Sequence, residues 1–552
     1  MAAAAPAPGD TLNLSGVVRD SQGRELRDVQ VQVEVDGQPL PTIEGETLVA
    51  TDRHGVFVAE FALPAGKLPP ARVEIRAQRP GFRSAALPVP VIEAPRDRAG
   101  GRVFQAVQKI TLKRRLTSAA WIAGGVLLAV FALITMERLH RTLAATLGAA
   151  LLLFITYAVG TFNEDFFILS FEDAVEAIDM NVVFLLLGMM FIVGVLRKTG
   201  LFRWLAYQAY ALARGRVLFL VCFLMLFTAA VSALIDNVTT MLLVIPVTIE
   251  LALPLKVNPT AFLIPEVFAA NLGGAATLIG DPPNVMIGSY ARLSFVDFLA
   301  NMSGIVLICV VVAVVYYFFW YRRVYRRVFD LDVSRTLDFF KTEYRIRDKR
   351  LLARSLIILA GMLLLFLVHH LLGMPPSVAA LSGAILLVII SRVDIVSLLE
   401  HEVEWPTLLF LMALFIIIAG VRSTGLLQMI ADWVDQTAGG NFILALLLVL
   451  WISALASCVV ETTAFTAAML PIIAHLSSIM PAAQGGALWW ALALGAAFGG
   501  NGTMIGASAN IVTVGLAEKA GYSISFGEYL KACFIPMLVT LALSTVYLIT
   551  VY

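Results

Sequence analysis

Charged residues are scarce in this chain of 552 residues: Asp, Glu, Lys and Arg make up 14% of it, whereas hydrophobic residues make up 59% and the mean hydropathy is +0.85. Soluble domains carry about 25% charged residues, so a soluble protein of any fold class is excluded. The net charge is only +1 and the basic residues gather in a few loops, which excludes a nucleic-acid partner. The composition indicates a polytopic protein embedded in a lipid bilayer.

Cysteine and histidine are rare as well. The four cysteines lie in or beside apolar stretches without a CxxC pair, so we expect them to be small core residues. The six histidines lack the spacing of metal ligands, and neither an HExxH motif nor a Ser/His arrangement points to an intramembrane enzyme. We therefore predict no enzyme and no cofactor apart from a coupling Na⁺ or H⁺. These residues are Cys222, Cys309, Cys458, Cys533, His54, His140, His369, His370, His401 and His475.

Residues 1–112 differ in kind from the rest of the chain. In segments such as 29–35 and 56–62, apolar and polar residues alternate with period two between turns rich in Gly, Pro and Asp. This pattern predicts a small β-sandwich domain. Its turns at Gly16–Asp20 and Thr51–Gly55 resemble those of transthyretin-like and carboxypeptidase-regulatory-like domains, a likeness of fold only. The small residues at the start are either a stub beyond a cleaved signal peptide or a disordered tail.

Ten apolar stretches after the β-rich part are long enough to cross a bilayer as single helices, because about 20 apolar residues span its hydrocarbon core. Two longer regions, 217–254 and 441–480, are each long enough to cross twice, but a polar pair interrupts each at its middle. Asp236 and Asn237 form the first pair, and Glu461 and Thr462 form the second. The ten stretches are 118–136, 142–160, 180–196, 260–290, 303–321, 355–372, 376–391, 406–421, 487–516 and 532–551.

Basic residues decide how these segments thread the membrane, because cytoplasmic loops are rich in Lys and Arg. The loops after the third and fifth stretches are basic and are expected in the cytoplasm, whereas the acidic segment 161–179 suits the outer side. These assignments agree only if region 217–254 returns to the side it enters, as a re-entrant hairpin. The basic residues are Arg197, Lys198, Arg203, Arg214, Arg216, Arg322, Arg323, Arg326, Arg327, Arg345, Arg347, Lys349, Arg350 and Arg354.

This threading places the N-terminal domain and the C-terminus outside the cytoplasm. Two features argue mildly against it: the basic residues Lys113–Arg115 before the first stretch, and the acidic loop Glu400–Glu404 on the predicted inner side. We expect an integral protein of a prokaryotic inner or plasma membrane rather than of an organelle.

Two polar, Gly-rich islands inside apolar segments repeat one another, at Asn271–Asn284 and Ala497–Asn510. Ahead of them, Ser232–Asp236 matches Ser457–Glu461 at nearly the same offset along the chain. Five predicted spans separate equivalent points, an odd number, so the second half is expected to be inverted. The predicted fold is an all-α polytopic membrane protein with inverted repeats, two re-entrant hairpins and two broken helices, preceded by a β-sandwich.

The corresponding domain boundaries follow from the charges and the repeat. Residues 1–112 are predicted to form the extracytoplasmic β-sandwich, and residues 113–325 the first transport repeat. A basic cytoplasmic linker, 326–354, joins it to the second transport repeat, 355–552.

Paired interruptions of this kind indicate the substrate site of a secondary transporter, near the midplane where hairpin tips and helix breaks meet. A carboxylate at that depth is costly unless it is paired, hydrated or protonated, which makes Asp236, Asp281 and Glu461 functional candidates. For Asp281 a simpler alternative is open, because an Asp before two prolines can merely cap the following helix.

Neutral side-chain oxygens and freed backbone carbonyls could complete a hard-oxygen shell for Na⁺, although some Asn and Thr residues are expected only to satisfy broken backbone ends. Glycines let the chain leave helical geometry and approach a ligand closely. The predicted Na⁺ ligands are Asp236, Asn237, Asn284, Thr462 and Asn510. The other predicted ion- or substrate-binding residues are Thr239, Asn271, Gly273, Thr277, Gly280, Asp281, Glu461, Thr463, Gly499, Asn501, Thr503 and Ser508.

At these motifs the chain resembles the ion transporter superfamily that includes arsenite permeases, NhaD-type sodium/proton antiporters and divalent anion/sodium symporters, and most of all its P protein branch. The resemblance runs from about residue 118 to the end and rests on 232–243, 273–284, 403–405, 451–457 and 499–510. It implies a site at hairpin tips and broken helices, elevator-like movement, a homodimer and an outward β-rich domain. The second tip departs from the usual Asp-Asn of that branch, which leaves the coupled ion open.

Several functions remain open at this point. A cation-coupled transporter of a small ion is favoured, as a sodium/proton exchanger or an ion-coupled anion permease. A dicarboxylate-like anion is disfavoured because acidic tips repel it unless Na⁺ or H⁺ screens them. Arsenite is neutral near neutral pH and leaves no charge pattern to recognise. A receptor or assembly protein that uses the β-domain and has lost transport is the alternative from another class.

Overall fold

A computed structural model describes residues 11–20, 25–26, 29–35, 38–43, 45–52, 54–63, 73–79, 82, 84–94, 103–112, 117–136, 138–213, 217–253, 255, 257–325, 344–369, 371–438, 441–480 and 485–552. The chain divides into two compact units. The described residues up to Gly124, with Leu152–Ser170 and Gly420–Leu426, form one unit, and the remaining described residues form the other. The basic residues Lys113–Arg115, Arg214 and Arg216, and residues 326–343 of the predicted linker, lie outside the described residues.

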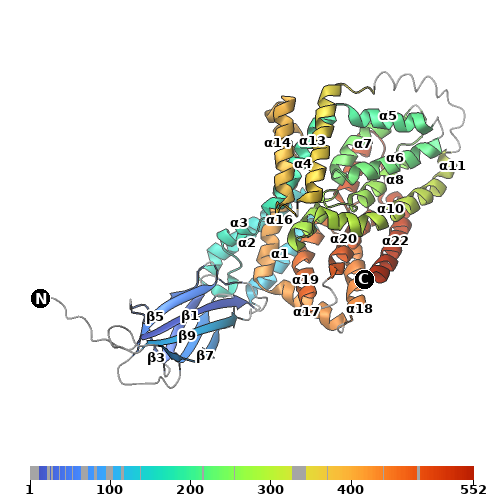
Figure 1. Cartoon of the computed structure of the whole chain (residues 1–552). Coiled ribbons are helices and arrows are strands. Elements are labelled where there is room, and N and C mark those ends of the chain that lie inside the picture. Colours follow the sequence, from blue (N-terminus) through green and yellow to red (C-terminus); the bar gives the residue numbers. More distant parts are fainter. Residues whose placement is uncertain are drawn as a thin grey trace. The chain divides into compact units, whose positions relative to one another are not determined.

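The N-terminal part consists of two β-sheets that share one hydrophobic core (Figure 1). One sheet has the order β5-β1-β9-β8, and the other has the order β3-β2-β6-β7 with β4 also paired to β2. Inward-facing apolar side chains alternate with polar ones, as Val31, Val33 and Val35 of β2 show, so the β-sheet structure predicted for this region is confirmed. The strands are β1 (Thr11–Asp20), β2 (Gln30–Val35), β3 (Gln38–Pro39), β4 (Val49–Ala50), β5 (Val56–Ala62), β6 (Val73–Gln78), β7 (Ala85–Pro88), β8 (Ile92–Ala94) and β9 (Val103–Leu112).

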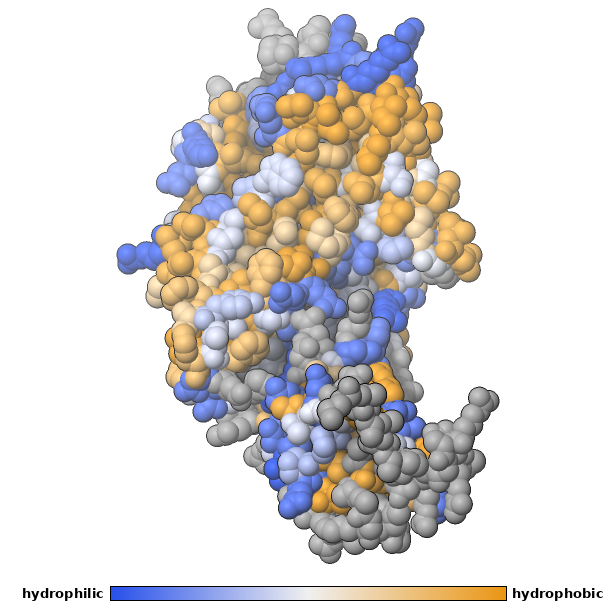
Figure 2. Space-filling view, turned by 90° about the vertical axis from the view of Figure 1, so that its left-hand side faces the viewer, coloured by the Kyte–Doolittle hydropathy of each residue, from blue (hydrophilic) through white to orange (hydrophobic). Residues whose placement is uncertain are grey.

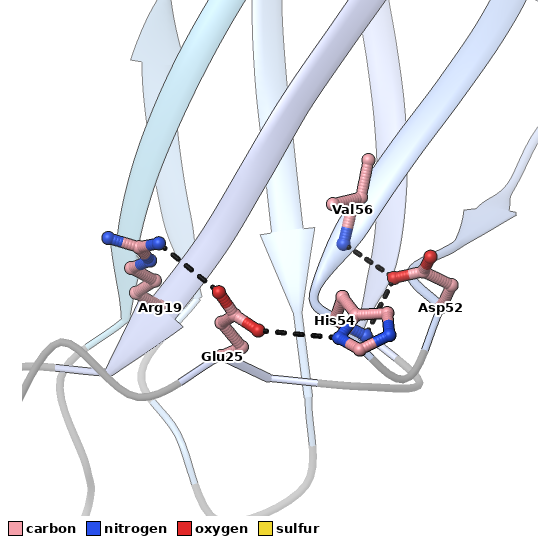
Figure 3. A network of polar contacts seen from close by, with 5 residues as sticks. All are labelled: Arg19, Glu25, Asp52, His54 and Val56. Atoms are coloured by element: carbon pink, nitrogen blue, oxygen red, sulfur yellow. Dashed lines mark hydrogen bonds and ion pairs between the residues drawn. The ribbon is translucent and has the colours of Figure 1, made fainter. Parts of the chain in front are cut away.

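The predicted turn before β5 is fixed by an acidic side chain. The Asp52 carboxylate accepts hydrogen bonds from the backbone N–H groups of His54 and Val56, both at 2.8 Å (Figure 3). Next to this turn, Glu25 forms ion pairs with Arg19 at 3.2 Å and with His54 at 3.7 Å. All three ion-pairing side chains are largely exposed, so these pairs add little stability and the turn rests mainly on Asp52.

Helices make up the rest of the described chain (Figure 1). In the first half they are α1 (Ser118–Thr135), α2 (Arg141–Ile155) with its π-helical end η1 (Thr156–Gly160), the 3₁₀ turn η2 (Glu164–Phe166), α3 (Phe171–Glu176), α4 (Met180–Lys198), α5 (Leu201–Ala213), α6 (Val217–Ser232), α7 (Asn237–Ala252), α8 (Thr260–Gly274), α9 (Pro282–Ala291), α10 (Phe295–Trp320) and α11 (Arg322–Tyr325). In the second half they are α13 (Lys349–Val368), α14 (Pro376–Ser391), α15 (Ile395–His401), α16 (Trp405–Ser423), α17 (Leu426–Ala438), α18 (Phe442–Ser457), α19 (Thr462–Ile479), α20 (Ala487–Gly499), η5 (Gly500–Gly502), α21 (Ser508–Lys519) and α22 (Phe526–Val551).

Each of the ten predicted single spans coincides with helical structure. Seven helices of the described chain are long and apolar enough to cross a membrane: α1, α2 extended by η1, α4, α10, α13, α16 and α22. An eighth span is the shorter apolar helix α14, and the remaining two are interrupted, as α8 followed by α9 and α20 followed by α21. Figure 2 shows hydrophobic residues gathered over the surface of the helical part, as expected for side chains that face lipid tails.

Helix boundaries recur between the two halves at one constant offset. Helices α4, α5 and α6 begin at Met180, Leu201 and Val217, and their counterparts α16, α17 and α18 begin at Trp405, Leu426 and Phe442 with the same spacing. The breaks recur too, because α7 and α19 begin just after Asp236 and Glu461. The amphipathic pair α5 and α17 was not predicted from the sequence. The sequence repeat is therefore also a repeat of secondary structure.

Candidate functional site

Two helix breaks each place an acidic side chain at the start of a helix. Helix α6 ends at Ser232, and the Asp236 carboxylate accepts a hydrogen bond from the Thr239 backbone N–H at 3.0 Å as α7 begins. Helix α18 ends at Ser457, and the Glu461 carboxylate accepts one from the Ala464 backbone N–H at 2.9 Å. Each acid thus caps a helix N-terminus, where free N–H groups and the helix dipole favour negative charge.

The two polar islands are true helix interruptions. Between α8 and α9 the chain is non-helical from Ala275 to Asp281, and between α20 and α21 it passes through η5 before α21 begins at Ser508. The side-chain amide of Asn284 donates to the carbonyls at the first break, and that of Asn510 does so at the second. The acceptors are Gly274, Ala275 and Thr277 for Asn284, and Gly500 and Thr503 for Asn510, at 2.8–3.3 Å.

Each break packs closely against the hairpin tip of its own half. Thr277 donates to the Ala233 carbonyl and Thr503 to the Cys458 carbonyl, and Thr462 donates to the Gly506 carbonyl at 2.7 Å. Glycine is required at this approach: a Cβ on Gly280 or on Gly506 would lie 2.6 Å from backbone carbonyl oxygens. Gly273 and Gly499 permit the same closeness, because a Cβ there would lie 2.1 Å and 2.3 Å from the Ala229 and Ala454 carbonyl oxygens.

A chain of asparagines joins the two halves. Asn237, at the first tip, donates from its amide to Asn271 Oδ1 at 3.1 Å. The Asn271 amide in turn donates to Asn501 Oδ1 at 2.9 Å and to Asn510 Oδ1 at 2.8 Å. All four side chains are buried, so their mutual hydrogen bonds offset the cost of removing them from water. These hydrogen-bonded asparagines fix the first hairpin tip relative to the second helix break.

Four carboxylic acids and one arginine line a single small cavity between these elements. The volume that the centre of a water-sized sphere can occupy within it is about 20 Å³. Two of the acids come from the tips, one from the break before α9, and one from the residue ahead of α16. The lining residues are Arg141, Leu186, Met190, Asp236, Asn237, Val238, Asn271, Asp281, Pro282, Glu404, Thr407, Phe410, Leu411, Glu461, Thr462, Thr463, Ala497, Ala507 and Ser508.

The carboxylates of this cavity are held in different ways. Glu461 accepts hydrogen bonds from the hydroxyls of Thr463 and Ser508, both at 2.8 Å, besides capping α19. Asp281 stands at the N-cap position of α9, but its side chain makes no capping hydrogen bond. The simple capping role considered for Asp281 is therefore not what the structure shows. No group of three His, Cys, Asp or Glu side chains among the described residues is arranged to hold a metal ion.

Arg141 and Glu404 were not predicted as site residues. Arg141, the first residue of α2, donates to the Ser508 hydroxyl and to the Thr407 hydroxyl, the latter at 2.8 Å, and stacks on the Phe410 ring at 5.5 Å. Thr407 in turn donates to Glu404 at 3.1 Å. Glu404 precedes the membrane-spanning helix α16, and burial, followed by the nearby Asp236 charge, raises its pKa to about 7. The sequence signals were the position of both residues at the starts of apolar stretches and, for Glu404, its place in the match at 403–405.

The predicted residues fall into two layers. Three of the five predicted Na⁺ ligands, Asp236, Asn237 and Thr462, line the cavity, whereas Asn284 and Asn510 lie behind it at the helix breaks. Asn271, Asp281, Glu461, Thr463 and Ser508 also line the cavity. The residues that do not line it are Thr239, Gly273, Thr277, Gly280, Gly499, Asn501 and Thr503, together with the two asparagines just named.

Comparison with known proteins agrees with this architecture. The family described as "Citrate transporter" matches residues 131–495. The uncharacterized transporter Rv2684 of Mycobacterium tuberculosis is 38% identical over 432 residues, which cover 77% of this chain and 97% of that protein. The P protein of Homo sapiens is 34% identical over 522 residues, which cover 80% of this chain and 61% of that protein. The crystal structure of the Alcanivorax borkumensis YdaH transporter covers 74% of this chain and 98% of its own, at 16% identity and a TM-score of 0.49.

The apolar helices, the family model and the similarity to transporter Rv2684 define the chain as a membrane transporter. It belongs to the citrate transporter family, and its relatives include the P proteins. The resemblance to the ion transporter superfamily is thereby confirmed.

Proposed function

We propose that the chain is a cation-coupled secondary transporter that binds its coupling ion, Na⁺ or H⁺, in the cavity between the hairpin tips and the helix breaks. The observation that carries this proposal is the convergence of Asp236, Asp281, Glu404 and Glu461 on one small cavity with one arginine. Four acids against one base leave excess negative charge in a protein interior. A bound cation or protons offset that charge.

The size of the cavity favours a small ion as the species it binds. A volume of about 20 Å³ accommodates about one water-sized species. The hydroxyl and amide oxygens of Thr462 and Asn237 border it together with the acids, which is the hard-oxygen chemistry that suits Na⁺. An organic anion such as a dicarboxylate requires the cavity to widen and its charge to be screened by the cation.

A second candidate, transport of an anion with the cation, is favoured by Arg141. Its guanidinium lies at the wall of the cavity, next to the N-terminus of α21, where free backbone N–H groups also favour negative charge. The family's description as citrate transporters agrees with an anionic substrate. Arsenite and a receptor function without transport have no residue in the cavity that favours them.

The positions of α4 and α16 support elevator-like movement between inverted repeats. Leu186 and Met190 of α4 line the cavity, whereas α16 contributes Thr407, Phe410 and Leu411. In the repeat, Leu186 of α4 corresponds to Leu411 of α16. The cavity-lining residues of α16 therefore lie about one turn nearer to the start of α16 than those of α4 lie to the start of α4. We infer that the hairpins and broken helices have moved along α4 and α16 toward the start of α16, the end predicted to be cytoplasmic.

We propose a homodimer in a prokaryotic inner membrane, with the β-domain and the C-terminus on the extracytoplasmic side and both hairpins re-entrant. The acidic segment before α4 and the basic residues after α10 support this orientation.

A thermal-shift screen of the purified full-length chain tests the ion assignment. Na⁺, Li⁺, citrate, arsenite and chloride are each added to the wild type and to Asp236→Asn. We expect Na⁺ or a lower pH to raise the melting temperature of the wild type, because a ligand that binds only the folded state stabilises it, and to have a much smaller effect on the variant. An equal shift in both proteins would contradict the proposed site.

A further inference from the structure

A carboxylic acid is buried in the helical bundle away from the cavity. Glu266 lies on α8 with none of its surface exposed, and it does not line the cavity of the tips. Its Oε1 accepts a hydrogen bond from the Thr248 hydroxyl of α7 at 2.9 Å, and its Oε2 has no hydrogen-bond partner among the described residues. Helices α7 and α8 are neighbours that also carry Asn237 and Asn271 of the asparagine chain (Figure 1).

Among the described residues, no positive charge compensates this acid. The charged residues on the helices packed against α8 lie near helix ends, and none of them forms an ion pair or hydrogen bond with Glu266 in the described structure. A titratable neighbour of Glu266 is the uncharged Tyr325, whose hydroxyl donates to the Ala261 carbonyl of α8 and which also lies near Cys222 of α6. Other titratable groups on those helices are Glu250, Asp297, Tyr316, Tyr317, Cys309, Glu518, Lys519, Glu528, Tyr529, Lys531, Cys533 and Tyr547.

The second half of the chain shows that the fold does not need this polar pair. By the offset of the repeat, Ile473 occupies the position of Thr248, and Leu492 occupies the position of Glu266. Both are fully buried, on α19 and α20. Two apolar side chains therefore fill the equivalent contact, and a buried acid there adds cost without a structural need.

We propose that Glu266 is a proton-binding site, separate from the cavity of the hairpin tips. The Oε2 oxygen gains a proton from water to form the neutral acid and returns it to water when α7 and α8 separate or the site becomes hydrated. A proton is the ligand because, among the described residues, only the Thr248 hydroxyl hydrogen-bonds to the acid, and these residues provide no oxygen shell for a metal ion. A neutral acid is also the form that an uncompensated apolar site tolerates.

This site would supply a proton to the transport cycle. Glu266 lies five residues before Asn271 on α8, about 7 Å along the helix axis. The coupling role rests on the proposed function, whereas proton binding itself does not. Binding and coupling are therefore measured separately.

Proton binding is tested by infrared spectroscopy on the purified full-length protein between about pH 6 and about pH 9. We expect a carbonyl band of a protonated carboxyl group in the wild type, and its loss in Glu266→Gln, which keeps the shape of the side chain. The control Glu518→Gln changes an exposed acid of α21 and should keep the band. Protonated acids of the cavity give carbonyl bands of their own, so the proposal is overturned if no carbonyl band of the wild type is lost in Glu266→Gln.

Two further variants keep the test decisive if Glu266→Gln does not fold. Thr248→Val retains the acid but removes its hydrogen bond, so the band should persist at a changed frequency. The double variant Thr248→Ile with Glu266→Leu copies the second half of the chain, so it should fold and lack the band. An unchanged band in Thr248→Val, or a retained band in the double variant, would contradict the assignment.

Coupling is tested by uptake into proteoliposomes under a proton gradient. In Glu266→Gln, we expect the acceleration of uptake by the gradient to fall about tenfold, which corresponds to about 1.4 kcal/mol, while the Na⁺-induced thermal shift stays unchanged. An unchanged acceleration with a lost infrared band would overturn the coupling role alone. Failure of the proposed cavity site is instead measured with Asp236→Asn, as a Na⁺-induced thermal shift equal to that of the wild type. The infrared band of Glu266 should be present in this variant.

Discussion

The two halves of the transporter body share their backbone plan and differ in their acids. At the tips, Asp236 corresponds to Glu461, which accepts hydrogen bonds from two hydroxyls of its own half. At the breaks, Asp281 of the first half corresponds to Ala507 of the second, and deeper in the bundle Glu266 corresponds to Leu492. The common geometry builds the site, and each half contributes different acids to the cavity: Asp236 and Asp281 from the first half, Glu404 and Glu461 from the second.

The largest loss of stability is expected from substitution of the glycines that hold each helix break against its hairpin tip. The loss should be equal in the two halves. Gly280→Ala and Gly506→Ala each place a Cβ 2.6 Å from two backbone carbonyl oxygens, so the hairpin tip must move away from the helix break. We expect each to lower stability by about 3 kcal/mol or to prevent folding. Thermal unfolding of the purified variants measures this effect.

Gly304→Ala serves as the matched control for these two variants. Gly304 lies within α10, and a Cβ there meets no atom within 4 Å. Alanine at that position should leave stability unchanged or raise it by about 0.5–1 kcal/mol. A strong loss for Gly280→Ala with a normal melting temperature for Gly506→Ala would show that the two halves are not built alike.

Arg141 of α2 is a positively charged residue of the cavity whose contacts are with the second half of the chain. Arg141→Gln removes its contacts with Ser508, Thr407 and the Phe410 ring, and charge-assisted hydrogen bonds are worth about 1.5–3 kcal/mol. We expect substrate uptake in proteoliposomes to fall by at least about tenfold. Arg292→Gln, which changes an exposed arginine after α9, is the control and should transport normally. Equal rates in both variants would remove Arg141 from the site.

The charge of the cavity should depend on pH through Glu404. Because its pKa is raised to about 7, this acid becomes charged as the pH rises through about 7, next to Asp236. Na⁺ affinity should therefore increase several-fold between about pH 6 and about pH 8 in the wild type, as measured by thermal shift. The same raised pKa favours the folded state below about pH 4.5, and this stabilisation is lost as the pH rises through about 7.

Glu404→Gln should weaken this rise in Na⁺ affinity with pH and remove the corresponding pH dependence of stability. The amide cannot gain a negative charge, yet it retains the size of the side chain and can still accept the hydrogen bond from Thr407. If the variant keeps the full rise in affinity, another group is responsible for it.

The smallest effect is expected in the β-domain. Asp52→Ala removes a side chain that accepts from two backbone N–H groups, so we expect a loss of about 1 kcal/mol in the stability of this domain. Glu25→Gln weakens only exposed ion pairs and should change stability by about 0–0.5 kcal/mol. Both variants should transport normally, which limited proteolysis and uptake measurements can check together. A change in transport would assign the β-domain a part in the cycle.

Local sequence patterns predicted most of the fold. Apolar length located the spans, because a bilayer demands it, and Gly, Pro and Asp marked the helix breaks, because their backbone preferences are local. The amphipathic helices α5 and α17 were missed, since their mixed composition resembles that of loops. Arg141 and Glu404 were missed because they lie far apart in the sequence and meet only in the folded chain. The direction of the Asn284 and Asn510 amides is likewise a property of the folded breaks and not of the residues alone.

The most direct test of the central claim compares the two tip acids in proteoliposomes. Uptake that depends on Na⁺ or pH is measured for Asp236→Asn and Glu461→Gln, with folding checked by thermal unfolding. We predict that Asp236→Asn abolishes coupled uptake, because the coupling charge of the first half is lost. Glu461→Gln should retain part of it, because Thr463 and Ser508 still fix that side chain. Unchanged coupled uptake in Asp236→Asn, or an equal loss in both variants, would contradict the proposal that coupling depends more on Asp236 than on Glu461.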